Sequence, residues 1–244
     1  MPTPGRPFAV TIPPGSPGSG EEIVVDVRMP ARLPAPMVVF AHGMDTLPSN
    51  YAALLDGLSN AGYLVVAPHF PGTRSDRPGG PDASTVGSQP GDVRRVISEL
   101  PALVPGFADA TDGRVAVVGH SLGGVTALAL VSQPSQMDPR ISAAVILAGE
   151  HQPVWAGGFQ ATAAPLLFIH GTADDVIPWT SGEAAWIASG PGHWWLALPN
   201  GTHGSPFTDP SPLVAHAVTT FLSTAINGDH SGNGIAALGA IPSP

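Results

Sequence analysis

The pentapeptide Gly119-His120-Ser121-Leu122-Gly123 constrains the fold of this chain more than any other segment. It lies between an apolar run at 115–118 and a helix-like segment at 125–131. A serine on a sharp strand-to-helix turn needs small residues two positions before and after it, because the backbones crowd there. The motif alone also arises by chance in a chain with 30 glycines, but its strand-turn-helix context predicts a nucleophile elbow with Ser121 as the candidate nucleophile.

Composition indicates a folded protein. Hydrophobic residues make up 43% of the 244 residues and charged residues only 11%, which favours one domain with a sizeable core. Glycine and proline fall between the periodic apolar segments and so mark tight loops. We expect a single domain over residues 1–226, followed by a loosely ordered tail over 227–244, which is Gly-rich and without periodicity.

Charge and residue usage exclude several function classes. The net charge of −9 leaves no basic face for nucleic acid. With no cysteine, the chain lacks disulfides, thiolate catalysis and Cys-ligated zinc, and no His and carboxylate spacing indicates another metal. We therefore expect no metal and no cofactor.

No apolar run is long enough for a membrane span, and no signal peptide pattern opens the chain. The expected protein is a soluble monomer, cytoplasmic or secreted as a mature form.

Strand and helix patterns alternate along the chain. Residues 8–12 and 22–28 predict an antiparallel hairpin at a sheet edge, joined by the Pro/Gly/Ser stretch 13–20. Apolar runs then predict buried strands, and i, i+3, i+4 spacing predicts helices. The strands are expected at 37–40, 63–67, 114–118, 143–147, 166–169 and 193–198, and the helices at 50–61, 92–100, 125–131 and 213–222. This order predicts an α/β fold with a mostly parallel central sheet and helices on both faces.

A catalytic serine needs a base within hydrogen-bond reach, and the base needs an acid that fixes its tautomer. After an elbow, the acid and then the histidine should follow later strands. Two adjacent carboxylates, Asp174 and Asp175, follow the strand at 166–169, and His203 follows the strand at 193–198. The order Ser121, acid, His203 is therefore the order expected after a nucleophile elbow. Composition does not choose between Asp174 and Asp175, and either carboxylate is equally typical of a solvated turn.

Acyl transfer also needs hydrogen-bond donors for a developing oxyanion. The elbow supplies the backbone N–H of Leu122, and the loop after the first central strand should supply the second. In that loop, Gly43 is expected to permit an unusual backbone angle and Met44 to present its N–H.

Together, His42-Gly43, residues 119–124, the segment His170-Gly171-Thr172-Ala173-Asp174 and the late His203 resemble the α/β-hydrolase superfamily over residues 20–226. The resemblance implies Asp174 as the acid, because the family's His-Gly-x-x-Asp aspartate falls there. Segments 61–68 and 71–76 are similar to compact dienelactone-hydrolase, acetylhydrolase-like and bacterial cutinase-like esterases. The chain lacks the cysteine nucleophile of the first group and the paired cysteines of secreted cutinases, which leaves the substrate open.

Only about eighteen residues separate the strands at 143–147 and 166–169, too few for a helical cap domain. We therefore expect an open cleft. Apolar residues on loops at the catalytic end of the sheet are candidates for an acyl- or aryl-binding wall, although each could equally cover the core. These residues, besides Met44, are Trp155, Trp179, Phe207 and Ile177.

The resulting hypothesis is a serine hydrolase that cleaves carboxylic esters through an acyl-enzyme. Its partner is a small-molecule or polymeric ester, with short to medium acyl groups and, by extension, polyesters. An acyltransferase, a thioesterase or an amidase shares the acyl-enzyme step, and residues of the triad do not separate these activities. A catalytically silent binding protein on the same fold is the alternative from another class.

Overall fold

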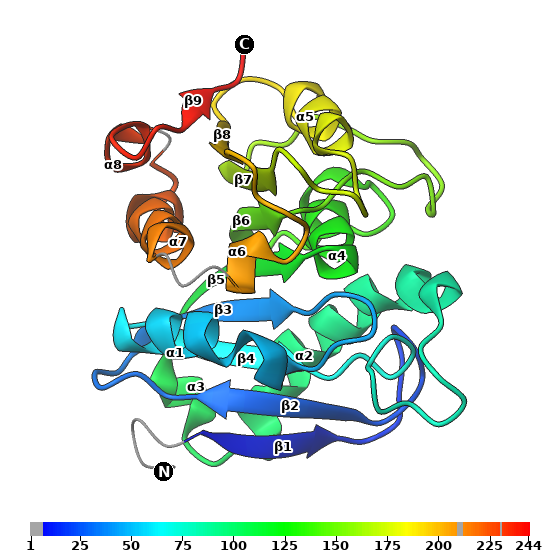
Figure 1. The fold of residues 1–244 in the computed structure, drawn as a ribbon. Coiled ribbons are helices and arrows are strands. Elements are labelled where there is room, and N and C mark those ends of the chain that lie inside the picture. The colour runs from blue at the N-terminus through cyan, green and yellow to red at the C-terminus, as the bar shows by residue number, and fades with distance from the viewer. Residues whose placement is uncertain (1–6, 209–211, 230) are drawn as a thin grey trace.

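The computed structural model describes residues 7–208, 212–229 and 231–244, and one nine-stranded sheet runs through its centre (Figure 1). The strand order is β1-β2-β4-β3-β5-β6-β7-β8-β9. Strands β3 to β8 pair in parallel, whereas β1, β2 and β9 join antiparallel at the two ends. The strands are β1 Phe8–Ile12, β2 Ile23–Arg28, β3 Ala35–Ala41, β4 Leu64–Pro68, β5 Thr111–His120, β6 Ile141–Leu147, β7 Leu166–Gly171, β8 Trp194–Leu198 and β9 Ile241–Pro242.

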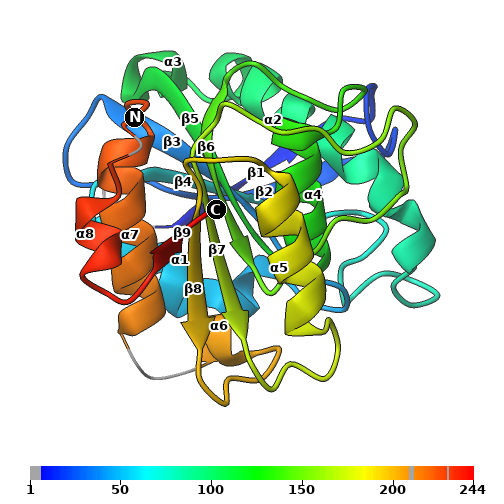
Figure 2. The same cartoon turned by 90° about the horizontal axis from the view of Figure 1, so that it is seen from above.

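Helices cover both faces of the sheet (Figure 2). Helices α2, α4 and α5 pack on one face, and α1, α7 and α8 pack on the other. Their bounds are α1 Ala52–Asn60, α2 Gln89–Leu103, α3 Phe107–Ala110, α4 Leu122–Ser132, α5 Trp179–Ala188, α6 Ser205–Thr208, α7 Leu213–Ala225 and α8 Asn233–Ala236, with 3₁₀ turns η1 Pro48–Tyr51 and η2 Ala83–Ser88. The predicted fold class, a mostly parallel sheet with helices on both faces and an N-terminal hairpin, is confirmed.

Alternation along the central strands builds two cores. In β3, Met37 and Val39 face the α2 and α4 layer, while Val38 and Phe40 face the α1 and α7 layer. All four are at most 3% exposed. Adjacent Trp194 and Trp195 in β8 divide between the two cores in the same way, because successive side chains of a strand point to opposite faces.

Besides the short helices α3, α6 and α8, one long helix is missing from the sequence-based expectation. Residues 179–188 form α5, so Trp179 opens a helix and does not lie on a loop as expected. Gly182 lowers the helix propensity of this segment, but a Cβ there would lie 2.5 Å from the Nδ1 atom of His170. The glycine is therefore explained by close packing of α5 on β7, a long-range contact that local periodicity does not reveal.

The C-terminal segment also differs from the loosely ordered tail that the sequence predicts for 227–244. Within the described residues, β9 pairs with β8, and Ile235 of α8 and Ala240 are buried in the α7 core. Two buried apolar side chains and one short strand pair suffice to hold a segment that has no periodicity of its own.

The segment between β6 and β7, residues 148–165, contains no helix, as expected for a fold without a cap in this connection. Among the helices in the described parts of the chain, none has both the length and the apolarity needed to cross a bilayer.

Candidate active site

The elbow forms as the glycine pattern predicts. Strand β5 ends at His120, α4 begins at Leu122, and Ser121 between them has φ 55° and ψ −122°. A Cβ on Gly119 would lie 2.0 Å from the carbonyl oxygen of Gly123. A Cβ on Gly123 would lie 2.0 Å from the carbonyl oxygen of Ala41. Only glycine allows this approach of strand and helix, and the strained Ser121 backbone is therefore held in place from both sides.

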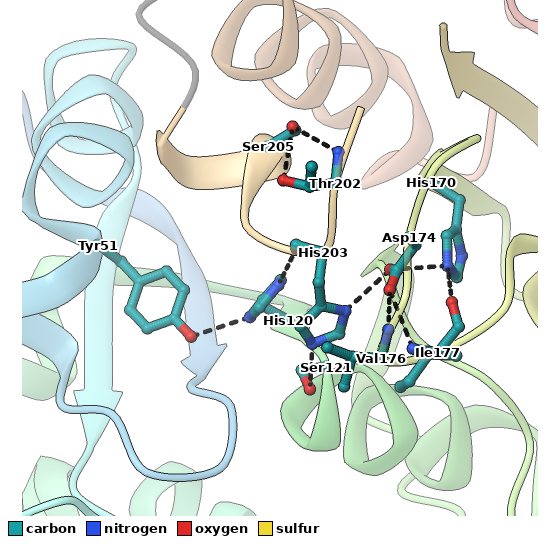
Figure 3. A network of polar contacts seen from close by, with 10 residues as sticks. All are labelled: Tyr51, His120, Ser121, His170, Asp174, Val176, Ile177, Thr202, His203 and Ser205. Carbon is teal, nitrogen blue, oxygen red and sulfur yellow. Dashed lines mark hydrogen bonds and ion pairs between the residues drawn. The ribbon is translucent and has the colours of Figure 1, made fainter. Parts of the chain in front are cut away.

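The structure brings together the side chains of Ser121, His203 and Asp174, the last being the acid that the family resemblance implies (Figure 3). The Nε2 atom of His203 lies 2.8 Å from the Ser121 hydroxyl oxygen. Its Nδ1 atom lies 2.8 Å from the Oδ2 atom of Asp174. A carboxylate only accepts hydrogen bonds, so Nδ1 carries the proton and Nε2 is free to accept the serine proton.

Of the two adjacent carboxylates, the one that reaches the imidazole is Asp174, whereas Asp175 is exposed. The Asp174 side chain is fully buried. Burial acts to raise the pKa of this carboxyl, but the hydrogen bonds from His203 and from the N–H groups of Ile177 and Val176 outweigh it and lower the pKa. Asp174 is therefore held as a carboxylate in the orientation that His203 requires.

A second imidazole contacts the same carboxylate. The Nε2 atom of His170 lies 3.1 Å from Oδ2 of Asp174 and 2.9 Å from the carbonyl oxygen of Ile177. Burial lowers the pKa of His170, so it is a neutral donor. This contact depends on how the 171–177 turn folds back, so local sequence does not predict it.

The two N–H groups expected to bind an oxyanion are available. Neither the N–H of Leu122 nor that of Met44 donates to another described residue. Gly43 does not adopt the unusual backbone angle that was expected; the positive φ of this loop is at Asp45, with φ 55°. Gly43 is instead needed for close approach, since a Cβ there would lie 3.1 Å from Cβ of Ser121.

His42 holds the same loop through two hydrogen bonds. Its Nδ1–H donates to the carbonyl oxygen of Gly43 at 2.7 Å, and its Nε2 atom accepts from the N–H of Phe70 at 2.9 Å. Burial lowers the pKa of His42 from 6.5 to about 4, despite the opposing effect of the Gly43 carbonyl. The folded protein therefore keeps this imidazole neutral.

This buried histidine predicts an acid-dependent loss of stability. Between about pH 6.5 and 4.5 the unfolded chain protonates His42 and the folded chain does not, so the free energy of unfolding falls by about 2 kcal/mol from this residue. Urea unfolding of wild type and His42→Gln at both pH values tests it. The wild type should lose about 2 kcal/mol more than the variant.

The comparison between the two proteins removes an opposing effect. Burial raises the pKa of Asp92 to about 6. As the pH falls, the folded chain therefore protonates Asp92 before the unfolded chain does, and this residue stabilises the folded state in acid. Asp92 is present in both proteins and cancels. Equal losses in wild type and His42→Gln would contradict the prediction.

Several of the apolar residues proposed for a substrate wall meet beside the elbow. Met44 and Trp155 pack against a small cluster formed by Val86, Leu122 and Val125. The Trp155 Nε1–H donates to the carbonyl oxygen of Gly87 at 3.1 Å, which fixes the ring. Val86 of η2 was not selected from sequence, because its loop carries no periodic signal.

The other wall candidates take different positions. The ring of Phe207 lies 4.7 Å from that of His120, on the side of the base. Ile177 is 8% exposed and its N–H holds Asp174, and Trp179 packs against Trp195. The site therefore has an apolar side at Trp155 and Met44 and an aromatic side at Phe207.

Within the described ranges, no group of three or more His, Cys, Asp or Glu residues is arranged to hold a metal ion.

Comparison with known proteins gives the family. A chlorophyllase family model matches residues 25–154, more than half of the chain. This chain belongs to the chlorophyllase family. The match includes the loop at Met44 and the elbow at Ser121 but ends before Asp174 and His203. A curated relative, the uncharacterized protein YfhR of Escherichia coli O157:H7, is 24% identical over 141 residues, which cover 49% of each chain. The alignment thus spans about half the length of that relative.

Solved structures share the fold of this chlorophyllase-family protein. The acylaminoacyl peptidase of Pyrococcus horikoshii superposes with a TM-score of 0.73 at 16% identity, covering 96% of this chain and 43% of the peptidase. Est1E of Butyrivibrio proteoclasticus superposes with a TM-score of 0.63 at 16% identity, covering 90% of this chain and 99% of Est1E. The esterase Est2 of Thermogutta terrifontis superposes with a TM-score of 0.62 at 17% identity, covering 84% of this chain and 86% of the esterase. These neighbours confirm the α/β-hydrolase fold.

Proposed function

We propose that this chlorophyllase-family protein hydrolyses carboxylic esters through an acyl-enzyme formed on Ser121. The observation that carries the proposal is the hydrogen-bonded series from Ser121 Oγ to His203 Nε2 and from His203 Nδ1 to Asp174 Oδ2, each step 2.8 Å long. The series has the proton order that a general base requires.

Each residue of the series has a defined role in the proposed reaction. His203 takes the Ser121 proton as the oxygen attacks the ester carbonyl, and Asp174 stabilises the imidazolium that results. The N–H groups of Leu122 and Met44 bind the oxyanion of the tetrahedral intermediate. His203 then donates its proton to the leaving alcohol, and water, activated by the same imidazole, releases the acid.

The apolar cluster supports short to medium acyl esters as substrates. Met44, Leu122 and Trp155 supply a dry surface next to the nucleophile, and an acyl chain on that surface loses contact with water. Two of the structural neighbours are esterases, and one structure of Est1E holds ferulic acid. Polyesters remain an extension of the same proposal, since the 148–165 connection contains no helix that could form a cap.

A substrate panel separates the proposal from its rivals. We expect turnover of p-nitrophenyl acetate, butyrate and octanoate, and slower turnover of the matched thioesters and p-nitroanilides. The acylaminoacyl peptidase among the neighbours makes the amide arm a necessary comparison, and the family name makes chlorophyll a further test substrate. Preference for the anilides over the esters would instead favour an amidase.

Trp155 gives a prediction about acyl length. Trp155→Ala should lower kcat/KM for p-nitrophenyl octanoate by about 10-fold, because roughly 1.4 kcal/mol of apolar contact with the chain is lost. The acetate is too short to reach the ring, so its kcat/KM should stay unchanged. Trp155→Phe is the matched control: it keeps an apolar ring and removes the N–H bond to Gly87, and it should retain most of the octanoate activity. Equal losses for both substrates would remove Trp155 from the acyl site.

A further inference from the structure

A buried series of hydrogen bonds joins the oxyanion loop to the loop of the proposed base. The N–H of Gly43 donates to the hydroxyl oxygen of Tyr51 at 3.1 Å. The Tyr51 hydroxyl lies 2.9 Å from Nδ1 of His120. Nε2 of His120 lies 2.9 Å from the backbone carbonyl oxygen of His203. In Figure 3, Tyr51 and His203 approach the His120 ring from opposite sides.

The chemistry of the groups fixes the direction of every bond in this series. The carbonyl oxygen of His203 only accepts, so Nε2 of His120 carries a proton and donates it. A neutral imidazole has one such proton, so Nδ1 is an acceptor and the Tyr51 O–H donates to it. The Tyr51 oxygen in turn accepts from the N–H of Gly43.

The His120 ring is neutral at the pH values at which esterases are assayed. It is 3% exposed, and burial lowers its pKa from 6.5 to about 3, against the opposing effect of the His203 carbonyl. A protonated ring would also leave the Tyr51 hydroxyl without its acceptor. The tautomer with the proton on Nε2 therefore allows all three hydrogen bonds of the series, from Gly43 to Tyr51, from Tyr51 to His120 and from His120 to the His203 carbonyl, to form at once.

We infer that Tyr51 and His120 are positioning residues that hold the oxyanion loop and the His203 loop in one fixed geometry around Ser121, an inference that rests on the proposed ester hydrolysis. The polar partners of these two side chains are not the Ser121 hydroxyl or the His203 ring nitrogens, although the His120 ring packs 4.9 Å from the His203 ring. Tyr51 fixes the N–H of Gly43, one residue before the Met44 N–H that is proposed to bind the oxyanion. His120 fixes the backbone of His203, whose ring must stay within 2.8 Å of Ser121.

Packing buries this series, with Tyr51 1% and His120 3% exposed. The ring of Phe207 lies 4.5 Å from that of Tyr51 and 4.7 Å from that of His120. A Cβ on Gly43 would be a tight fit, 3.1 Å from both the Tyr51 hydroxyl and Nδ1 of His120, so that these side chains would have to shift. Hydrogen bonds in such a buried environment hold their geometry better than bonds that compete with water.

Tyr51→Phe tests the role by removing one hydroxyl and leaving the ring. We expect kcat for p-nitrophenyl butyrate to fall by about 10-fold with KM unchanged, because oxyanion donors act in the transition state. The chain has one other tyrosine, Tyr63, which is 6% exposed and lies in the same α1 and α7 core. Tyr63→Phe is the matched control and should keep the wild-type kcat. Equal kcat values for wild type, Tyr51→Phe and Tyr63→Phe would overturn the inference.

A second readout does not depend on activity. In protein labelled with ¹⁵N-histidine, the His120 resonances, assigned by their loss in His120→Gln, should show a protonated Nε2 and an unprotonated Nδ1 from about pH 6 to 8. In Tyr51→Phe the Nδ1 resonance should shift, since its donor is gone, while Tyr63→Phe should leave it in place. A protonated Nδ1 in the wild type would overturn the series of bonds.

The two readouts distinguish failure of this inference from failure of the proposed function. If the wild type turns over esters in a Ser121-dependent way but Tyr51→Phe keeps full kcat, only the positioning role is overturned. If the wild type turns over none of the esters, the proposed function is wrong and the positioning role for that reaction falls with it, whatever tautomer His120 adopts. A drop in KM alone for Tyr51→Phe would also count against positioning.

Discussion

Ser121→Ala is expected to lower kcat for p-nitrophenyl butyrate by roughly 10⁶-fold, the scale found when the nucleophile of a serine hydrolase is removed. The variant keeps the binding surface, the two oxyanion N–H groups and the base, so a residual rate above that of water is expected. The fold should tolerate the change, because the strained φ of 55° at this position is imposed by Gly119 and Gly123 from outside. Stopped-assay kinetics with the three p-nitrophenyl esters, combined with thermal unfolding, measure both effects.

The serine at the C-terminal end of α4 gives a matched control for this prediction. Ser132 is the last residue of α4, it is buried, and its hydroxyl has no hydrogen-bond partner among the described residues. Ser132→Ala should therefore keep the wild-type kcat and at least the wild-type stability. A Ser121→Ala variant that retains more than about one per cent of kcat would exclude the acyl-enzyme proposal, since no covalent intermediate can form on it.

Asp174→Asn is expected to lower kcat by about 10³- to 10⁴-fold, because the amide no longer stabilises an imidazolium. The wild-type carboxylate accepts from His203 through Oδ2 and from the N–H groups of Val176 and Ile177 through Oδ1. An Asn oxygen can accept from the two N–H groups, which turns its NH₂ toward Nδ1 of His203 and selects the tautomer that cannot act as base toward Ser121. The turn should stay folded while the base is disabled.

Asp175→Asn is the control that the sequence itself provides. Asp175 is the neighbouring carboxylate, it is exposed, and neither the His203 ring nor the His170 ring contacts it. Its variant should keep kcat within about two-fold of wild type, the scale expected for a solvated surface charge. Similar losses in Asp174→Asn and Asp175→Asn would mean that the acid acts through the net charge of the turn and not through the hydrogen bond.

The chain order of the site could be predicted from sequence because each signal is local. Gly119 and Gly123 show where strand and helix approach too closely for a side chain, and the apolar runs before Asp174 and His203 place both residues after neighbouring parallel strands. Parallel strands deliver their carboxyl ends to one edge of the sheet. Residues far apart in sequence therefore meet there without any knowledge of their contacts.

Tertiary structure explains the features that depend on turns and packing. The family resemblance implied Asp174 over Asp175, and the fold-back of residues 174–177 gives the physical reason, because it aims one carboxylate inward and leaves the other in water. Helix α5 and the β9 strand were missed because their stability comes from contacts with His170 and Trp194 on distant segments.

The sequence by itself thus determined the fold class and the elbow, and it predicted the order of the proposed nucleophile, acid and base, since the hydrophobic period, the glycine spacing and the strand order depend on neighbouring residues. Only the tertiary structure showed that Tyr51 and His120 join the oxyanion loop to the loop of His203. These bonds span 69 and 83 residues of chain. Hydrogen bonds of that range leave no local pattern, because they exist only once the sheet has brought the loops together.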